Sequence, residues 1–177
     1  MESFVALLRG INVGGRTSVP MAELRSMAEE IGLAEVRTYI QSGNLIFRAD
    51  EREGLEEKLE AAVAKRFIPA AVIVRSQAEW VRYVEGNPFR EASVSEPNRV
   101  MLCVARKPAG ERDAAALQER ARDGEQVRAG GGALWIHFPA GGGTSRLFNG
   151  MSRNAEPATT RNWRTVLKLH ETLQGTA

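Results

Sequence analysis

The chain has 177 residues, of which 43% are hydrophobic and 26% charged, and its formal net charge is +2. This length suits one ordinary domain or two small ones with a buried core, and the composition excludes an intrinsically disordered chain. The apolar run 4–8 is too short for a membrane span and has no basic segment before it, unlike a signal peptide. We therefore expect a cytoplasmic globular protein with no membrane partner.

A glycine-rich segment follows this run and carries the strongest functional signal. Glycines let backbone amides approach a ligand closely, and an anion can sit among such amides. The segment also matches the phosphate-loop pattern from Gly10 to Thr17, except that Arg16 stands in the lysine position. However, residues 18–20 intervene before the helix start expected near Pro20, and no strand-like run ends in a magnesium-binding Asp. A nucleotide-hydrolysing phosphate loop is therefore disfavoured.

The first half of the chain predicts the element order β-α-β-β-α-β. Helical spacing of apolar residues alternates with short apolar runs, and 41–44 has the Gly and Asn of a hairpin turn. This is the ferredoxin-like pattern, and an unrelated α+β sandwich with the same order is the alternative. We predict strands at 4–9, 36–41, 45–48 and 71–75, with helices at 20–32 and 51–68.

The second half predicts an imperfect echo of the first that ends in helices. We expect a ferredoxin-like subdomain at 1–86, a connection at 87–97 and a second α+β subdomain at 98–177, packed together. Thr159 or Thr160 is expected to cap the last helix, which makes the end of this subdomain helical. The predicted elements are helices at 77–85, 111–122, 146–149 and from about 159 onward, a turn at 87–89, and strands at 99–105, 126–129 and 133–138.

The predicted topology brings separated loops together. The first two strands of a ferredoxin-like unit run in the same direction, so the exit of the first lies at the same end as the hairpin tip. This polar, partly cationic edge suits a carboxylate, phosphate or amide-bearing ligand. The alternative is that the amides satisfy turn backbone, the arginines are solvated and Trp163 is a core anchor. The candidate ligand-binding residues are Arg9, Gly10, Asn12, Gly14, Gly15, Arg16, Gln41, Ser42 and Asn44, with Arg161, Asn162 and Trp163 as a third wall near a helix N-terminus.

Other chemistry is hard to find in the sequence. Cys103 lies in an apolar run and is expected to be a buried strand residue, and His137 and His170 have no ligand-spaced partners. Ser42 lacks the setting of a nucleophile elbow. The glycines of 141–145 are either another anion nest or a flexible connection. We therefore expect no metal and no cofactor, and we identify no catalytic residue.

Four segments together resemble the bacterial domain-of-unknown-function family 1697. They are Leu8-Arg9-Gly10-Ile11-Asn12-Val13-Gly14-Gly15, Val19-Pro20-Met21-Ala22-Glu23-Leu24, Thr38-Tyr39-Ile40-Gln41-Ser42-Gly43-Asn44 and Thr160-Arg161-Asn162-Trp163. The resemblance runs from end to end and implies a two-subdomain α+β protein without an established activity. Two departures from the family pattern are Thr17, where Asn is common, and 149–154, where a Lys- and Leu-rich stretch is expected.

Three functional hypotheses follow from the sequence. The first is a binding module for a small anionic or nucleotide-like ligand at the composite edge. The second is an enzyme acting on a phosphorylated or carboxylated small molecule, with arginines stabilising charge in the transition state. The third is a nucleic-acid or protein interaction module, which the mildly basic isoelectric point near 9.0 allows without indicating it. The oligomeric state stays open.

Overall fold

The computed structural model describes residues 1–12, 18–143, 145–147 and 157–175. Contacts within the chain divide it into two compact units. The first unit comprises Met1–Gln77 with Leu169–Ala177, and the second comprises Ala78–Lys168. Each unit is described by itself below.

The first unit has the predicted ferredoxin-like order. Its four strands form one antiparallel sheet in the order β2-β3-β1-β4, which places β1 between β3 and β4. Because β1 and β2 are both antiparallel to β3, they run in the same direction, as the sequence analysis expected. The elements are β1 Glu2–Leu8, α1 Met21–Glu30, β2 Ala34–Tyr39, β3 Asn44–Ala49, α2 Leu55–Arg66 and β4 Val72–Ser76.

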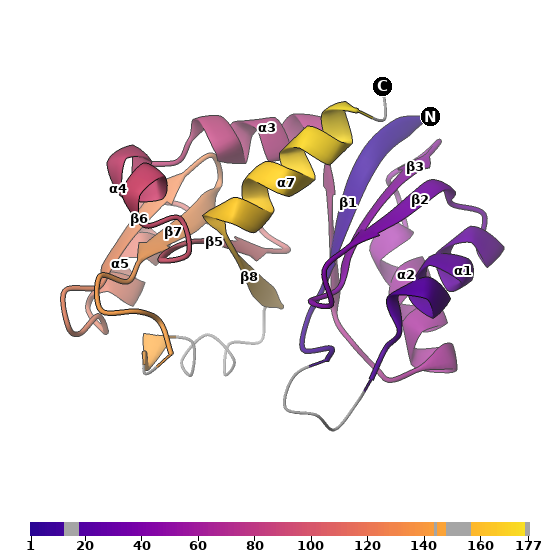
Figure 1. Cartoon of the computed structure of the whole chain (residues 1–177), viewed down its shortest axis with the longest axis horizontal. Helices are drawn as coiled ribbons and strands as arrows, with labels where there is room; N and C mark the ends of the chain where they lie inside the picture. The colour runs from indigo at the N-terminus through magenta and orange to yellow at the C-terminus, as the bar shows by residue number, and fades with distance from the viewer. Residues whose placement is uncertain (13–17, 144, 148–156, 176–177) are drawn as a thin grey trace. The chain divides into compact units, whose positions relative to one another are not determined.

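The core of the first unit lies between its sheet and the helices α1 and α2, which cover one face of the sheet (Figure 1). Alternate residues of β1, such as Phe4 and Ala6, point into this core. Leu24 of α1 and Leu59 of α2 meet them with no exposed surface. The period-3.6 spacing of the helices and the period-2 spacing of the strands therefore bury one continuous apolar layer.

The second unit contains another four-stranded antiparallel sheet, in the order β6-β7-β5-β8. Its strand β5 pairs with β7 and β8, as β1 pairs with β3 and β4 in the first unit. The predicted α+β fold class is therefore confirmed. The elements are α3 Gln77–Glu85, α4 Arg90–Ser95, β5 Val100–Ala105, α5 Glu111–Gln118, β6 Gln126–Gly130, β7 Ala133–His137, β8 Ala158–Asn162 and α7 Trp163–Gln174, the last continuing into residues grouped with the first unit.

One prediction for the second unit was wrong. The last helix does not begin at Thr159 or Thr160, because these residues belong to β8 and pair with Val104 and Cys103 of β5. Threonine is β-branched and fits a pleated strand, and the ladder to β5 supplies the partners for its backbone. The second sheet therefore repeats the strand order of the first more closely than predicted. Residues 148 and 149 of the predicted helix at 146–149 lie outside the described residues.

The division by contacts also differs from the predicted boundaries 1–86, 87–97 and 98–177. The predicted connection contains α4, and α3 contacts the second unit. The indole nitrogen of Trp80 in α3 donates to the carbonyl of Val166 at 3.1 Å, a buried hydrogen bond within the second unit. This tertiary contact joins α3 to α7 within the second unit, although the chain leaves the first sheet only one residue before α3 begins.

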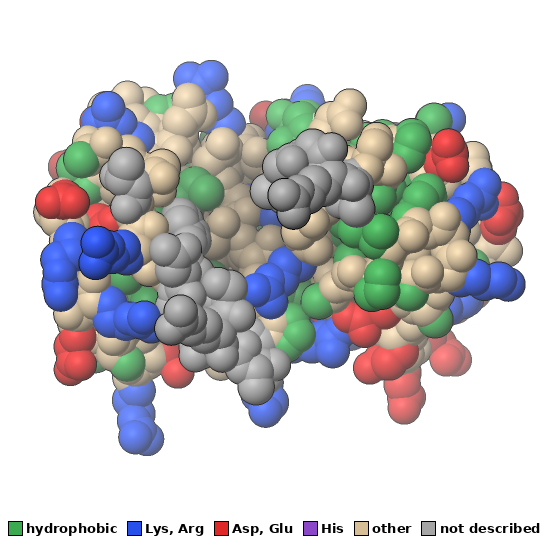
Figure 2. Space-filling view, turned by 90° about the horizontal axis from the view of Figure 1, so that it is seen from below, with side chains coloured by type: hydrophobic (Ala, Val, Ile, Leu, Met, Phe, Trp, Pro, Cys, Tyr) green, Lys and Arg blue, Asp and Glu red, His purple; other side chains and the backbone are tan. Residues whose placement is uncertain are grey.

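Within the described residues, no helix is long and apolar enough to cross a membrane. Side chains of both charge signs are scattered over the face shown in Figure 2, in blue for Lys and Arg and in red for Asp and Glu. This mixture agrees with the small net charge of +2.

Candidate functional site

The exit of β1 and the tip of the β2–β3 hairpin meet at one edge of the first sheet. The backbone N–H of Leu8 donates to the carbonyl of Gly43 at 2.8 Å, and Leu7 lies opposite Asn44 in the ladder. The two segments are thus joined directly although about 30 residues separate them in the sequence. We call the described part of this place, residues 9–12 and 41–44, the loop–hairpin edge.

Asn12 is the side chain that ties the loop–hairpin edge together. Its amide nitrogen Nδ2 donates to the carbonyl of Gln41 at 2.8 Å and to that of Val19 at 3.0 Å. Its Oδ1 accepts a hydrogen bond from the backbone N–H of Val19 at 2.7 Å. Asn12 has a left-handed backbone with φ of 55°, a conformation that Asn tolerates better than most residues. One carboxamide therefore holds the hairpin tip, the glycine-rich loop and the approach to α1 together.

The hairpin tip is held by Asn44 and by a close approach at Gly43. Asn44 is fully buried, and its Nδ2 donates to the carbonyl of Tyr39 at 2.9 Å and to Ser42 Oγ at 3.0 Å. Gly43 has φ of 77°, and a Cβ there would lie 2.6 Å from Cδ1 of Ile11. Both facts favour glycine, because few other residues adopt a left-handed backbone and because an added Cβ would also lie 2.9 Å from Cβ of Leu8.

Arg9 brings a positive charge to this edge. It follows β1 directly, its side chain is half-buried, and its backbone N–H donates to the carbonyl of Ala71 at 2.9 Å. Gly10 beside it has φ of 72°. The predicted ligand-binding residues Gly14, Gly15 and Arg16 lie outside the described residues.

The carboxamides of Asn12 and Asn44 are thus engaged with backbone groups, and the hydroxyl of Ser42 accepts a hydrogen bond from Asn44. Asn12 and Asn44 thus satisfy turn backbone, as the alternative interpretation expected. Ligand binding by the predicted residues stays a prediction.

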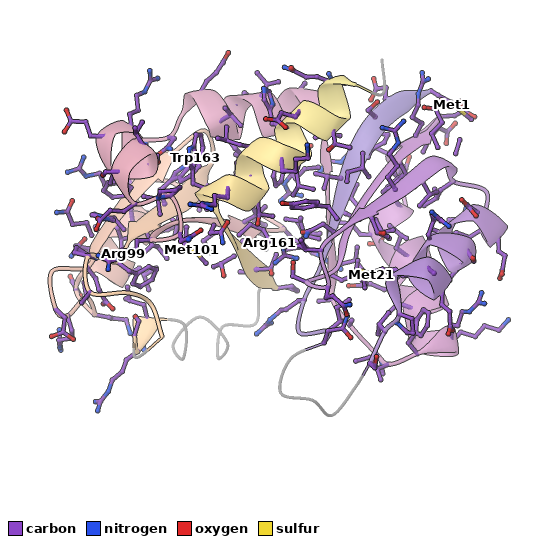
Figure 3. The ribbon with its side chains drawn as sticks, in the orientation of Figure 1. Met1, Met21, Arg99, Met101, Arg161 and Trp163 are labelled. Atoms are coloured by element: carbon purple, nitrogen blue, oxygen red, sulfur yellow. The ribbon has the colours of Figure 1, made fainter. Side chains whose placement is uncertain are left out.

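The predicted third wall is in the second unit and differs in its local structure from the sequence prediction. Arg161 lies on β8 rather than at a helix start (Figure 3), and only 7% of it is exposed. Burial lowers the pKa of its guanidinium to about 10. Its Nη1 donates to Thr159 Oγ1 and to the carbonyl of Thr160, both at 2.8 Å. A role for Arg161 in the same site as the glycine-rich loop stays a prediction.

The residues after Arg161 begin the last helix. Asn162 Oδ1 accepts a hydrogen bond from the backbone N–H of Thr165 at 3.0 Å, which is the cap that the sequence analysis assigned to a threonine. The ring of Trp163 packs against that of Trp135, with 5.6 Å between the ring centroids. Trp163 is half-buried, and its ring packs on an aromatic neighbour.

The sulfur and imidazole groups offer little for catalysis or metal binding. Cys103 is buried on β5 as predicted, and burial raises the pKa of its thiol to about 12. It borders a cavity of about 560 Å³ beside α5, but a protonated thiol is a poor nucleophile. Over the described ranges, no three His, Cys, Asp or Glu side chains gather closely enough to hold a metal ion.

One polar cluster in the second unit was not predicted from the sequence. His137 Nε2 lies 3.0 Å from Glu96 Oε2, and Nη1 of Arg99 lies 2.7 Å from Glu96 Oε1. The hydrogen bond from His137 is the main cause that lowers the pKa of the Glu96 carboxyl. Glu96 and His137 are 41 residues apart, so no local spacing indicated that they would meet. The sequence showed only that these positions carry ionisable side chains.

The fold and the loop–hairpin edge define a class: an α+β protein with two four-stranded antiparallel sheets, in the first of which the end of β1 is bonded to the tip of the β2–β3 hairpin. The family model described as "Protein of unknown function (DUF1697)" matches residues 1–135. The chain therefore belongs to the DUF1697 family, as its motifs suggested.

A solved structure shows the same architecture. It is the conserved bacterial protein SP0830 from Streptococcus pneumoniae, with 26% sequence identity and a TM-score of 0.75. The similarity covers 97% of this chain and 98% of the other. No curated protein matches the chain.

Proposed function

We propose that this protein binds a small anionic or nucleotide-like ligand at the loop–hairpin edge. The observation that carries the proposal is the triple hydrogen bonding of Asn12, which joins the glycine-rich loop to the hairpin tip. A site whose walls are fixed before binding loses less conformational entropy when the ligand arrives. The backbone N–H groups at this edge are therefore held in position before a ligand binds.

Arg9 supplies the charge that favours an anion. Its guanidinium has five N–H donors in a planar fork, which matches the oxygens of a carboxylate or phosphate. Within the part of the chain that the structure describes, the Arg9 side chain has no hydrogen bond or ion pair of its own. Its donors are therefore uncommitted there, in contrast to the carboxamides of Asn12 and Asn44.

A ligand panel tests this function. The intact protein is screened by thermal shift with nucleotides, phosphorylated metabolites and di- and tricarboxylates. A ligand at a hundred times its dissociation constant stabilises the folded state by about 2.7 kcal/mol. We expect at least one anion to raise the melting temperature, and we expect Arg9→Gln to weaken this effect by about tenfold in affinity.

Two further variants make the screen specific. Asn12→Ala removes the hydrogen bond between residue 12 and the hairpin tip. We expect it to lower the affinity for the same ligand, although the charge of Arg9 remains. Arg25→Gln removes an exposed arginine of α1 and is the matched control, expected to bind like the unmodified protein. An affinity that Arg9→Gln and Asn12→Ala leave unchanged would rule out this edge as the site.

The screen also separates the other two functional classes. Conversion of a bound compound to product would assign the protein to the enzyme class. Binding to nucleic acid that falls steeply between low and moderate salt, with no small ligand bound, would replace the proposal by an interaction module.

A further inference from the structure

A second cavity lies entirely within the second unit, on the face of its sheet opposite to α5. Its volume is about 480 Å³, within the range typical of small-ligand sites. Gln126 and Arg128 of β6 and His137 of β7 line it from the sheet. Phe89 and Arg90, which precede and begin α4, line it from the other side.

The sheet wall of this cavity follows from strand alternation. Gln126 is directly opposite His137 in the antiparallel ladder, and Arg128 is two residues further along β6. Side chains two residues apart in a strand share a face, so these three groups face the same side. Val127 and Ile136, between them in sequence, instead join the apolar cluster that contains residues of α5.

The helical wall is fixed by a buried carboxamide. Asn87 Oδ1 accepts from the backbone N–H of Phe89 at 2.9 Å, and its Nδ2 donates to Ser93 Oγ at 2.8 Å. Both Asn87 and Ser93 are almost fully buried. The turn that carries Phe89 and Arg90 is therefore held in one conformation by hydrogen bonds that water cannot easily replace.

Two arginines give the cavity a positive lining. The guanidinium of Arg128 lies over the ring of Phe89, with Cζ 5.0 Å from the ring centroid. Its Nη2 also donates to Gln126 Oε1 at 3.5 Å, and the remaining in-plane N–H groups of the guanidinium stay available for an anion. Arg90 uses Nη2 for the carbonyl of Glu85 at 3.0 Å, which leaves other donors of its fork. The carboxylate of Glu91 also lines the cavity, and the two arginines outweigh it.

His137 completes the polar lining. Its Nε2 donates to Glu96 Oε2, as the carboxylate can only accept, so Nδ1 is the remaining polar atom of the ring. Glu96 also pairs with Arg99, labelled in Figure 3. The ring of His137 packs at 5.7 Å from that of Phe89, which holds the imidazole at the cavity wall.

From this arrangement we infer that the cavity of the second unit is a binding site for a small molecule bearing an oxyanion, either a phosphate or a carboxylate group. Arg128 is its principal anchor, Arg90 is an additional cationic contact, and the ring of His137 shapes the wall beside them. This site is separate from the loop–hairpin edge and does not depend on the function proposed there.

Titration of the isotopically labelled intact protein tests this inference. Inorganic pyrophosphate and citrate are added separately at constant ionic strength, and the amide and arginine Nε–H signals are followed by NMR. We expect saturable shifts at Phe89, Arg90 and Arg128. Saturation by pyrophosphate alone assigns a phosphate ligand, and saturation by citrate alone assigns a carboxylate ligand.

Matched variants locate the binding. Arg128→Gln and Arg90→Gln keep a polar side chain at exposed positions. Each is expected to lower the affinity for the probe by about tenfold or more. Arg112→Gln, at an exposed position of α5 outside the cavity, makes the same charge change and is expected to leave the affinity within about twofold. An intact amide spectrum confirms that each variant is folded.

Two results would overturn the inference. One is the absence of saturable shifts with either probe. The other is binding that Arg128→Gln and Arg90→Gln leave unchanged. If Arg9→Gln instead abolishes the shifts, the probe occupies the loop–hairpin edge, so failure here and failure of the proposed function give different results.

Discussion

At two turns of this protein, the side chain of an asparagine takes the place of a backbone amide. The carboxamide carries both a donor and an acceptor, so Asn12 can bond to the N–H and the carbonyl of Val19 at once. Asn87 also uses both groups in the second unit: it accepts from the backbone N–H of Phe89 and donates to the hydroxyl of Ser93. Aspartate would lack the donor at neutral pH, and leucine would lack both groups. The chemistry of the side chain thus explains why these positions are asparagine, even without a ligand.

At the same scale, the burial of Cys103 predicts that its thiol reacts slowly in the native protein. Burial raises the pKa of its thiol from 9.0 to about 12, so at pH 8 the thiolate fraction falls by about a thousandfold relative to the unfolded chain. We expect a thiolate-selective reagent to label the native protein far more slowly than the urea-unfolded protein. Similar labelling rates in the two states would show that the thiol is accessible.

The same shift predicts a pH dependence of stability. The native state keeps the Cys103 proton between pH 9 and about 12, whereas the unfolded state releases it, so the unfolded state binds fewer protons in this window. This contribution to the free energy of unfolding is therefore fully present below pH 9 and is lost as the pH rises toward 12. Comparison with Cys103→Ala in urea unfolding at pH 8 and pH 10.5 isolates it from other groups.

At the scale of elements, the hairpin between β6 and β7 is shaped by glycines. Gly131 and Gly132 have φ of 66° and 91°, as a two-residue hairpin of the primed type requires. A Cβ on Gly130 would collide with the carbonyl oxygen of Gly86 at the end of α3. The three successive glycines therefore serve both the turn and the close approach of a helix end.

This close approach predicts a large effect of one methyl group. Gly130→Ala forces the backbone of α3 and of the hairpin apart, and we expect a loss of about 1–3 kcal/mol in the free energy of unfolding, measured in urea. Gly175→Ala is the matched control, because a Cβ there meets its neighbours only at 3.6 Å or more. Equal stabilities of the two variants would contradict the contact between Gly86 and Gly130.

At the scale of the whole molecule, the two units carry different spectroscopic probes. All three tryptophans, Trp80, Trp135 and Trp163, belong to the second unit, whereas each unit has its own sheet and apolar core. Tryptophan fluorescence therefore reports on the second unit, and far-ultraviolet circular dichroism reports on both.

Because fluorescence reports on the second unit alone, a core substitution in the first unit can show whether the two units unfold separately. Leu59 is fully buried in the core of the first unit, and Leu59→Ala is expected to cost about 2–5 kcal/mol. We expect the circular dichroism transition in urea to begin at lower concentration while the fluorescence midpoint stays in place. Equal shifts of both signals would instead show that the chain unfolds as one cooperative body.

Much of the fold could be predicted from local patterns. The alternation and helical spacing of apolar residues located the elements of the first unit, because each pattern reflects a face that must be buried. The strand at 158–162 could not be found in this way. Its residues Ala-Thr-Thr-Arg-Asn show no apolar alternation, and their extended conformation depends on hydrogen bonds to β5, about 55 residues earlier.

The candidate site, too, could be predicted from the sequence only in part. The sequence by itself determined which residues could form it, since the glycines, the amides and Arg9 lie in two turn-forming segments and the ferredoxin-like order brings these to one edge. Only the tertiary structure decided what the side chains do there: Asn12 and Asn44 bond to backbone, Arg161 is buried on a strand, and a cationic cavity forms in the second unit. The physical reason is that a side chain's partners are chosen by groups brought close in space, and hydrogen bonds and burial at that range leave no periodic trace in the sequence.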